Sequence, residues 1–385
     1  MASAKYSLEF YVTLFNKDLG EFGGYYGRTY RSQAYPMRQA GGSWDMDKED
    51  IIYFHTSYIE KTSFLIIECV IVRDIAGIKS YSSGGYALCD VFQFKGLESV
   101  DLIKGSPRNI GAGGIEAAFR SAKAGRLQYE VRPFPQFDKI KYLVPRNTFV
   151  GLEEVLPGIE GDKIPNPRTA GKLLSVNLLP RADLYIHNIN MITSTAFESR
   201  FENFLRRMKQ EKYRGADNAR GNLNNVVIDE RKIIVSVNNT WRNVVEDAYT
   251  SMSSPNQQGV STSGGSLTIK NFICHPMVAL IFRVEYKATI PMPNGNEQMF
   301  FTIGWTLHLP AFNAAGELSN EQLETNFTMG PGTTPNGDLL WDANAEDTKY
   351  YQVKIKALIS VNSSPPPANA ASGPGMGEFF KATNA

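Results

Sequence analysis

The chain has 385 residues, of which 42% are hydrophobic and 21% charged, and 40 basic against 39 acidic side chains leave a net charge of +1. This length and apolar content exclude a globally disordered chain and favour two domains plus extensions. The balanced charge argues against a dedicated nucleic-acid binder, for which a basic surplus is expected.

The first half of the chain predicts a β-sandwich over residues 1–165. Leu8, Phe10, Val12 and Leu14 alternate with more polar residues, which is the period of a half-buried strand. Further apolar, β-rich runs are punctuated by Gly, Pro and Ser, as in a sandwich. We expect strands in these runs, at 50–60, 63–73, 86–94, 127–134 and 140–145, with a loop over 74–85.

The second half opens with a predicted amphipathic helix at 195–213. Apolar residues recur there at steps of three and four, Thr195 and Glu198 form a capping box, and Gly215 follows as a stop. We place this helix in a linker, 166–225, at the junction of the two domains. A second sandwich is expected over 226–362, from strand-like runs at 232–239, 266–272, 277–290, 299–309 and 350–361.

Residues 363–385 predict an extended tail rich in Pro, Ala, Ser and Gly. The tail has no periodicity from which to build a core, and its three consecutive prolines favour an extended polyproline conformation. Its large apolar side chains include Phe379 and Phe380, which we expect to insert into a pocket on a neighbouring protein of a large assembly.

The stretch KGSPRNIGAGG at 104–114 resembles a phosphate loop only in its glycines. It lacks the Gly-Lys-Ser/Thr of a Walker A loop, and Glu116 follows where a dinucleotide loop has glycine. We interpret Gly105, Pro107 and Arg108 as a structural turn, because proline fixes φ and glycine permits tight geometry. Arg108 is expected to bond carbonyls or a carboxylate of its own domain.

No constellation of catalytic or metal-binding residues stands out. There is no GxSxG motif, the four histidines are scattered, and Cys69, Cys89 and Cys274 have no metal-ligand spacing. Asp74 and Asp90 are too few and too far apart for a calcium site. We therefore expect no enzyme activity, no cofactor and no metal site, and histidines and thiols in structural roles.

The localisation expected from the sequence is intracellular. The N-terminus has no uninterrupted apolar signal region, and no run approaches the roughly 20 apolar residues of a membrane span. The sequons at Asn238, Asn326 and Asn362 are then chance matches, because glycosylation of asparagine needs a secreted chain.

A basic patch follows the predicted helix between residues 206 and 220. Six cations accompany two carboxylates there, namely Arg206, Arg207, Lys209, Lys212, Arg214 and Arg220 with Glu211 and Asp217. One reading is a solvated helix end, where cations complement the helix dipole. The other reading is a docking patch for an acidic partner surface such as tubulin.

The order of these pieces resembles the nephrocystin-4 family of ciliary scaffold proteins. The resemblance begins at GRTYRS (27–32), includes Gly-Ser-Pro-Arg at 105–108, and is most specific in HPMVALIFRVEY (275–286) and IGWTLHLPAF (303–312). It spans roughly residues 25–315 and corresponds to the N-terminal region of longer family members. It implies C2-like or immunoglobulin-like sandwiches, no catalysis, and partners among other ciliary proteins.

Two hypotheses follow from the resemblance. The first is a structural or scaffold protein of cilia or flagella, part of the cytoskeleton, that docks through its sandwiches and tail onto axonemal, doublet-microtubule-associated or ciliary-base partners. The second is a C2-type adaptor at the ciliary transition zone that binds membranes without calcium, through surface lysines. Nucleic acid is not an expected partner.

Overall fold

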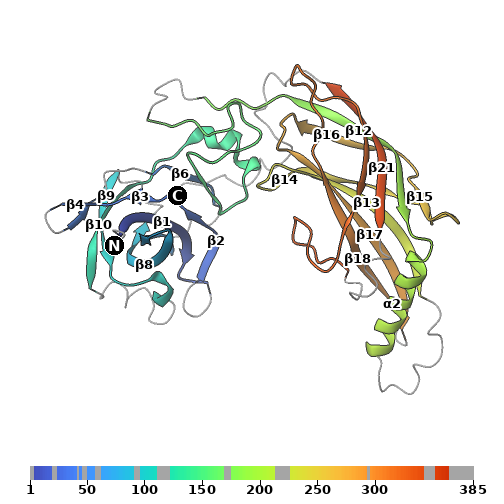
Figure 1. The fold of residues 1–385 in the computed structure, drawn as a ribbon, viewed down its shortest axis with the longest axis horizontal. Coiled ribbons are helices and arrows are strands. Elements are labelled where there is room, and N and C mark those ends of the chain that lie inside the picture. Colours follow the sequence, from blue (N-terminus) through green and yellow to red (C-terminus); the bar gives the residue numbers. More distant parts are fainter. Residues whose placement is uncertain are drawn as a thin grey trace, which may run out of the picture. The chain divides into compact units, whose positions relative to one another are not determined.

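The computed structural model describes residues 4–19, 24–40, 43–45, 50–56, 62–90, 96–110, 122–168, 175–212, 226–292, 295–341 and 352–363. Within these ranges the chain is mainly β with a single α-helix, which confirms the expected fold class. The chain divides into two compact units, Met1–Asn177 and Leu178–Ala385 (Figure 1). Each unit is described by itself.

Unit 1 is built on a seven-stranded antiparallel sheet. Its strands follow the order β10-β9-β8-β7-β1-β2, with β3 also pairing with β1. Their bounds are β1 (Lys5–Asn16), β2 (Gly24–Arg31), β3 (Tyr35–Pro36), β7 (Ser63–Ile75), β8 (Ile78–Asp90), β9 (Leu97–Ile103) and β10 (Lys123–Glu130). Two short pairs complete the unit: β4 (Arg38–Ala40) with β5 (Ser43–Asp45), and β6 (Ile52–Phe54) with β11 (Phe149–Gly151).

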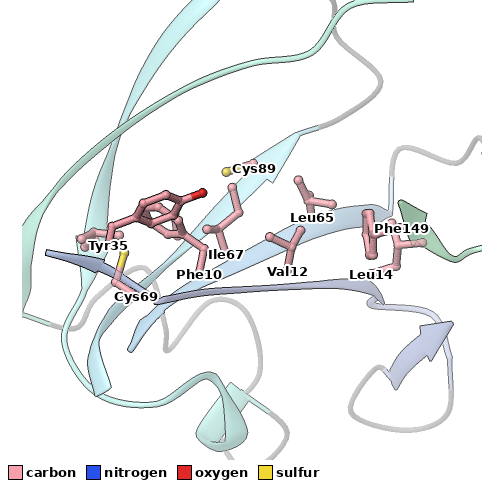
Figure 2. Packing of buried hydrophobic residues seen from close by; sticks show 11 residues of the cluster. Phe10, Val12, Leu14, Tyr35, Leu65, Ile67, Cys69, Cys89 and Phe149 are labelled. Atoms are coloured by element: carbon pink, nitrogen blue, oxygen red, sulfur yellow. The ribbon is translucent and has the colours of Figure 1, made fainter. Parts of the chain in front are cut away.

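One core cluster of unit 1 lies on the face of this sheet that the alternation in β1 marks, and Phe15 and Ile66 belong to a second cluster. Phe10, Val12 and Leu14 are at most 9% exposed and pack with Leu65 and other side chains of β7. Figure 2 shows Phe149 of the β6–β11 pair beside Leu14, so the short pair covers this face. Every second side chain of β1 from Phe10 to Leu14 is therefore buried between the sheet and the short pair, which pack on each other as in a sandwich.

Two segments of unit 1 differ from the expectation. Residues 78–85 belong to β8, because Ala76 and Gly77 both have positive φ and close a two-residue hairpin directly after β7. Residues 135–143 form two 3₁₀ helices, η2 (Pro135–Lys139) and η3 (Lys141–Leu143), instead of a strand at 140–145. Pro135 begins η2, where its missing N–H is not needed.

Unit 2 is a sandwich of two five-stranded sheets. One sheet has the order β15-β12-β21-β19, with β16 also beside β12, and the other has the order β14-β13-β17-β18-β20. The first contains β12 (Arg181–Thr193), β15 (Val260–Thr262), β16 (Leu267–Ile273), β19 (Glu321–Asn326) and β21 (Val353–Ser363). The second contains β13 (Val227–Asn238), β14 (Asn243–Ser251), β17 (Ala279–Met292), β18 (Gly295–His308) and β20 (Thr328–Met329).

The expected linker at 166–225 differs from the structure, which places β12 at the centre of a sheet. Leu184, Ile186 and Met191 in β12 are at most 1% exposed, and β12 pairs with β21 along most of its length. Asn188 has a φ of 53° at an irregularity in this pairing. This irregularity breaks the alternation of apolar residues and explains why the strand is hard to see in the sequence.

The expected helix is present as α2 (Phe197–Lys212). Figure 1 shows it along one end of the sheet that contains β13, β17 and β18. Its ring contacts among the described residues are with unit 2, including Tyr286 and Trp341. The helix is therefore a covering element of unit 2, which the expectation of a junction helix did not anticipate.

Candidate docking site

The inner face of helix α2 is anchored by aromatic packing. Phe201 is fully buried, and its ring meets the rings of Tyr286, Phe301 and Trp341 edge-on, with centroid separations of 5.5, 5.3 and 5.0 Å. Edge-to-face pairs of this kind add to the free energy gained from apolar burial. The apolar residues that recur at the helical period, and so predict the helix, therefore also define the face that packs on the sheet.

A buried ion pair fixes the first turn of the same helix. Arg231 of β13 donates two hydrogen bonds to the carboxylate of Glu198, the Nη2–Oε2 distance being 2.8 Å. The Tyr286 hydroxyl donates to the same carboxylate at 3.3 Å, and the Arg231 guanidinium lies 5.7 Å from the centre of the Tyr286 ring. The two charged side chains are only 10% and 18% exposed.

The pKa directions agree with this geometry. Burial raises the pKa of Tyr286 well above its ordinary value, and the neighbouring Glu198 charge raises it further. Burial alone would lower the pKa of Arg231, but the bonds to Glu198 outweigh it and the pKa is raised. Both groups therefore keep their protons, and the cluster is a structural clamp on α2.

The cations predicted on this helix do not all face outward. Lys209 is only 7% exposed, so it is not available to a partner. Arg206 is half-buried and holds Glu202 at 3.3 Å and Asn203 at 3.0 Å. Arg207 is exposed, and within the described part of the chain it forms no ion pair.

The remaining predicted docking residues are beyond what the structure describes. Lys212 ends α2 as its last residue, and its side chain is not described. Arg214, Arg220, Phe379 and Phe380 lie outside the described residues. The part of the candidate site that the structure defines is therefore the outer edge of α2 around Arg207.

The Gly-Ser-Pro-Arg segment forms a capped 3₁₀ turn, η1 (Pro107–Asn109). Ser106 accepts a bond from the backbone N–H of Arg108, and Gly105 has a φ of 104°. The Tyr25 hydroxyl donates to the Pro107 carbonyl at 2.6 Å, and the Ser83 hydroxyl donates to the Gly105 carbonyl at 2.8 Å. These bonds support a structural role for the turn, since both donors belong to the neighbouring sheet.

The partner expected for Arg108 is not seen among the described residues. Its side chain is exposed, and the one bond it shows is made by its backbone N–H. Within the described residues its guanidinium has no carbonyl or carboxylate partner. The Gly105 and Pro107 carbonyls of the turn accept hydrogen bonds from hydroxyl groups.

The histidines have structural partners. The Nε2 atoms of His55, His187 and His308 lie 2.9 Å from the Val144 carbonyl, Ser360 Oγ and Glu321 Oε1 respectively. His275 Nδ1 accepts the Met277 backbone N–H at 3.0 Å. Within the described ranges, no three His, Cys, Asp or Glu side chains form a cluster fit for a metal ion.

Within the described part of the chain, no helix is both long and apolar enough to cross a membrane.

Sequence reasoning missed the clamp on α2 and the burial of Lys209. The sequence indicates Glu198 only as a capping residue, and nothing local to Arg231 indicates its partner, 33 residues away in the chain. The burial of Lys209 does have a sequence signal. It follows Phe197, Phe201 and Leu205 at steps of four, which places it near the buried stripe of the helix.

The fold defines a protein of C2-like β-sandwiches. The family model described as "Nephrocystin-4 second C2-like domain" matches residues 182–364, which is nearly the whole described part of unit 2. Nephrocystin-4 from Xenopus laevis is 23% identical over 409 aligned residues, covering 91% of this chain and 27% of the relative. The two matches show that the chain is similar to nephrocystin-4, which agrees with the resemblance in its motifs.

The chain spans about a quarter of the length of the relative that it matches, 27%. The match to the second C2-like domain begins at residue 182, so the strand β12 belongs to the domain that the model describes.

Proposed function

We propose that the chain is a non-enzymatic scaffold protein of cilia or flagella, which docks onto other ciliary proteins through the surfaces of its sandwiches. The observation that carries this proposal is the colinear likeness to nephrocystin-4 over 91% of the chain. The satisfied histidines and the clamped helix agree with a framework whose polar groups hold the fold together.

The docking surface that we favour is the exposed edge of α2 around Arg207. The aromatic anchor at Phe201 and the ion pair at Glu198 hold the helix in place, so its outer side chains are presented on a rigid support. A cation on such a support can meet an acidic protein surface, of which tubulin is one example.

The experiment that tests this proposal is fractionation of isolated cilia that carry the tagged chain. We expect the chain to be enriched in cilia over cell bodies and to remain with the axoneme when detergent removes the ciliary membrane. Exclusion of the chain from cilia contradicts the proposal. Complete release with the membrane fraction contradicts docking on axonemal proteins.

A further inference from the structure

The hairpin β7–β8 ends in an apolar tip. Ile75 and Ile78 face each other across the two-residue turn and are 37% and 78% exposed. Ala76 and Gly77 at the turn both have positive φ, of 55° and 88°, and the backbone N–H of Gly77 donates to Asp74 at 2.9 Å. This turn geometry matches the twist of the two strands, so the tip is a rigid feature.

The tip is supported by three paired strands. β1 pairs with β7 up to Lys5 and Asp74, and β7 pairs with β8 up to Ile75 and Ile78. β9, in contrast, pairs with β8 only at Tyr86, so the last part of the hairpin extends past it. The isoleucines therefore stand at one end of the sheet on a well-ordered base.

Cations surround the tip. Lys5, Arg73 and Lys79 are exposed. Lys79 lies two positions after the turn and Arg73 three positions before it, and Lys5 pairs with Asp74 in the register. No ion pair holds any of the three within the described residues. The one carboxylate among them, Asp74, is engaged by the turn itself. The end of the sheet thus carries free positive charge around exposed apolar side chains.

We propose that this tip docks onto an anionic membrane surface, with Ile78 and Ile75 entering the headgroup region and the three cations meeting lipid phosphates and carboxylates. Apolar side chains flanked by cations are the combination that binds such an interface. A stable protein interface buries about 800 Å² on each partner, which is far more than two isoleucines beside a turn can supply. The inference goes beyond the proposed scaffold role and does not depend on it.

The test is co-sedimentation of the full chain with vesicles of phosphatidylcholine alone and of phosphatidylcholine with phosphatidylserine. We expect binding to the mixed vesicles only, because the cations need anionic lipid. Ile78→Asp should lower the partition coefficient about 10-fold or more. Lys79→Gln should lower it about fivefold. Absence of binding to the mixed vesicles by the unmodified chain overturns the proposal.

The matched control is Leu97→Asp. Leu97 is 67% exposed and begins β9, whose pairing with β8 places it at the opposite end of the same sheet. This variant should bind as the unmodified chain does, and an equal loss of binding in both aspartate variants contradicts the assignment to the tip. As a second measurement, the emission that Ile78→Trp adds to that of the four native tryptophans, obtained by subtracting the spectrum of the unmodified chain, should shift to the blue with mixed vesicles. An unchanged emission from a bound protein also contradicts it.

Discussion

Glu198 in the first turn of α2 and Arg231 in β13 form a bidentate ion pair that is largely shielded from solvent. The pair joins the helix to the sheet beneath it, next to the buried ring of Tyr286. Because the helix presents the candidate docking residues, this contact connects the stability of unit 2 to the orientation of Arg207.

Glu198→Gln should destabilise unit 2 by about 3 kcal/mol, because it leaves the Arg231 charge buried without a counter-ion. Urea unfolding measures this change. Glu202→Gln is the control, since Glu202 pairs with Arg206 near the surface, where each side chain is about a third exposed. Glu202→Gln should lower the free energy of unfolding by less than about 1 kcal/mol. An equal loss in the two variants contradicts a special role for the buried pair.

Gly27, the first residue of the GRTYRS motif, should not tolerate a side chain. Its φ is 76°, and a Cβ there would lie 2.1 Å from the Asn147 carbonyl oxygen. Gly96 has a similar φ of 89° but open space around it. Gly27→Ala should therefore cost about 1–3 kcal/mol more than Gly96→Ala, because only the first adds a clash to the backbone strain. Thermal unfolding of both variants checks this difference, and equal midpoints argue against it.

The buried thiols of unit 1 predict a loss of stability in alkali. Burial raises the pKa of Cys69 from 9.0 to about 12, and it raises that of Cys89 as well. Above pH 9.0 the unfolded chain releases protons that the folded chain keeps up to about pH 12. These groups therefore leave the free energy of unfolding unchanged below this window and lower it as the pH rises through it.

Denaturation of the chain at about pH 8 and about pH 10 measures this loss. Replacing both thiols with alanine should reduce the difference between the two pH values, even though the variant is less stable at each. In the native protein, the half-buried Cys274 should be alkylated before Cys69 and Cys89. Fast alkylation of Cys89 at neutral pH contradicts the assignment.

The periodic segments were predictable from the sequence. Phe10, Val12 and Leu14 alternate as a strand requires, and Phe197, Phe201 and Leu205 recur as a helix requires. Each pattern marks one buried face, so each predicts both the element and the side that it buries. Arg181–Thr193 carries the same alternation, but Asn188 interrupts it, so the sequence pattern alone suggests a linker there.

Segments that depend on tertiary context were not predictable in the same way. Ile140, Leu143 and Val144 are apolar and buried. A short apolar run is expected both in a buried strand and in buried 3₁₀ turns, so the sequence does not distinguish the two. The contact between Glu198 and Arg231 joins elements far apart in the chain, which a local pattern cannot specify. The basic residues of 206–220 are close in sequence, yet the helix turns Lys209 inward and Arg207 outward.

The most direct test of the scaffold account is the localisation of two charge-reversal variants in ciliated cells. Arg207→Glu reverses the exposed cation of α2, and Lys270→Glu reverses an exposed cation on β16 of the same unit. The account predicts that the ratio of ciliary to cytoplasmic signal falls several-fold for Arg207→Glu and stays unchanged for Lys270→Glu, with both variants folded. Equal ciliary enrichment of Arg207→Glu and the unmodified chain would contradict docking through α2.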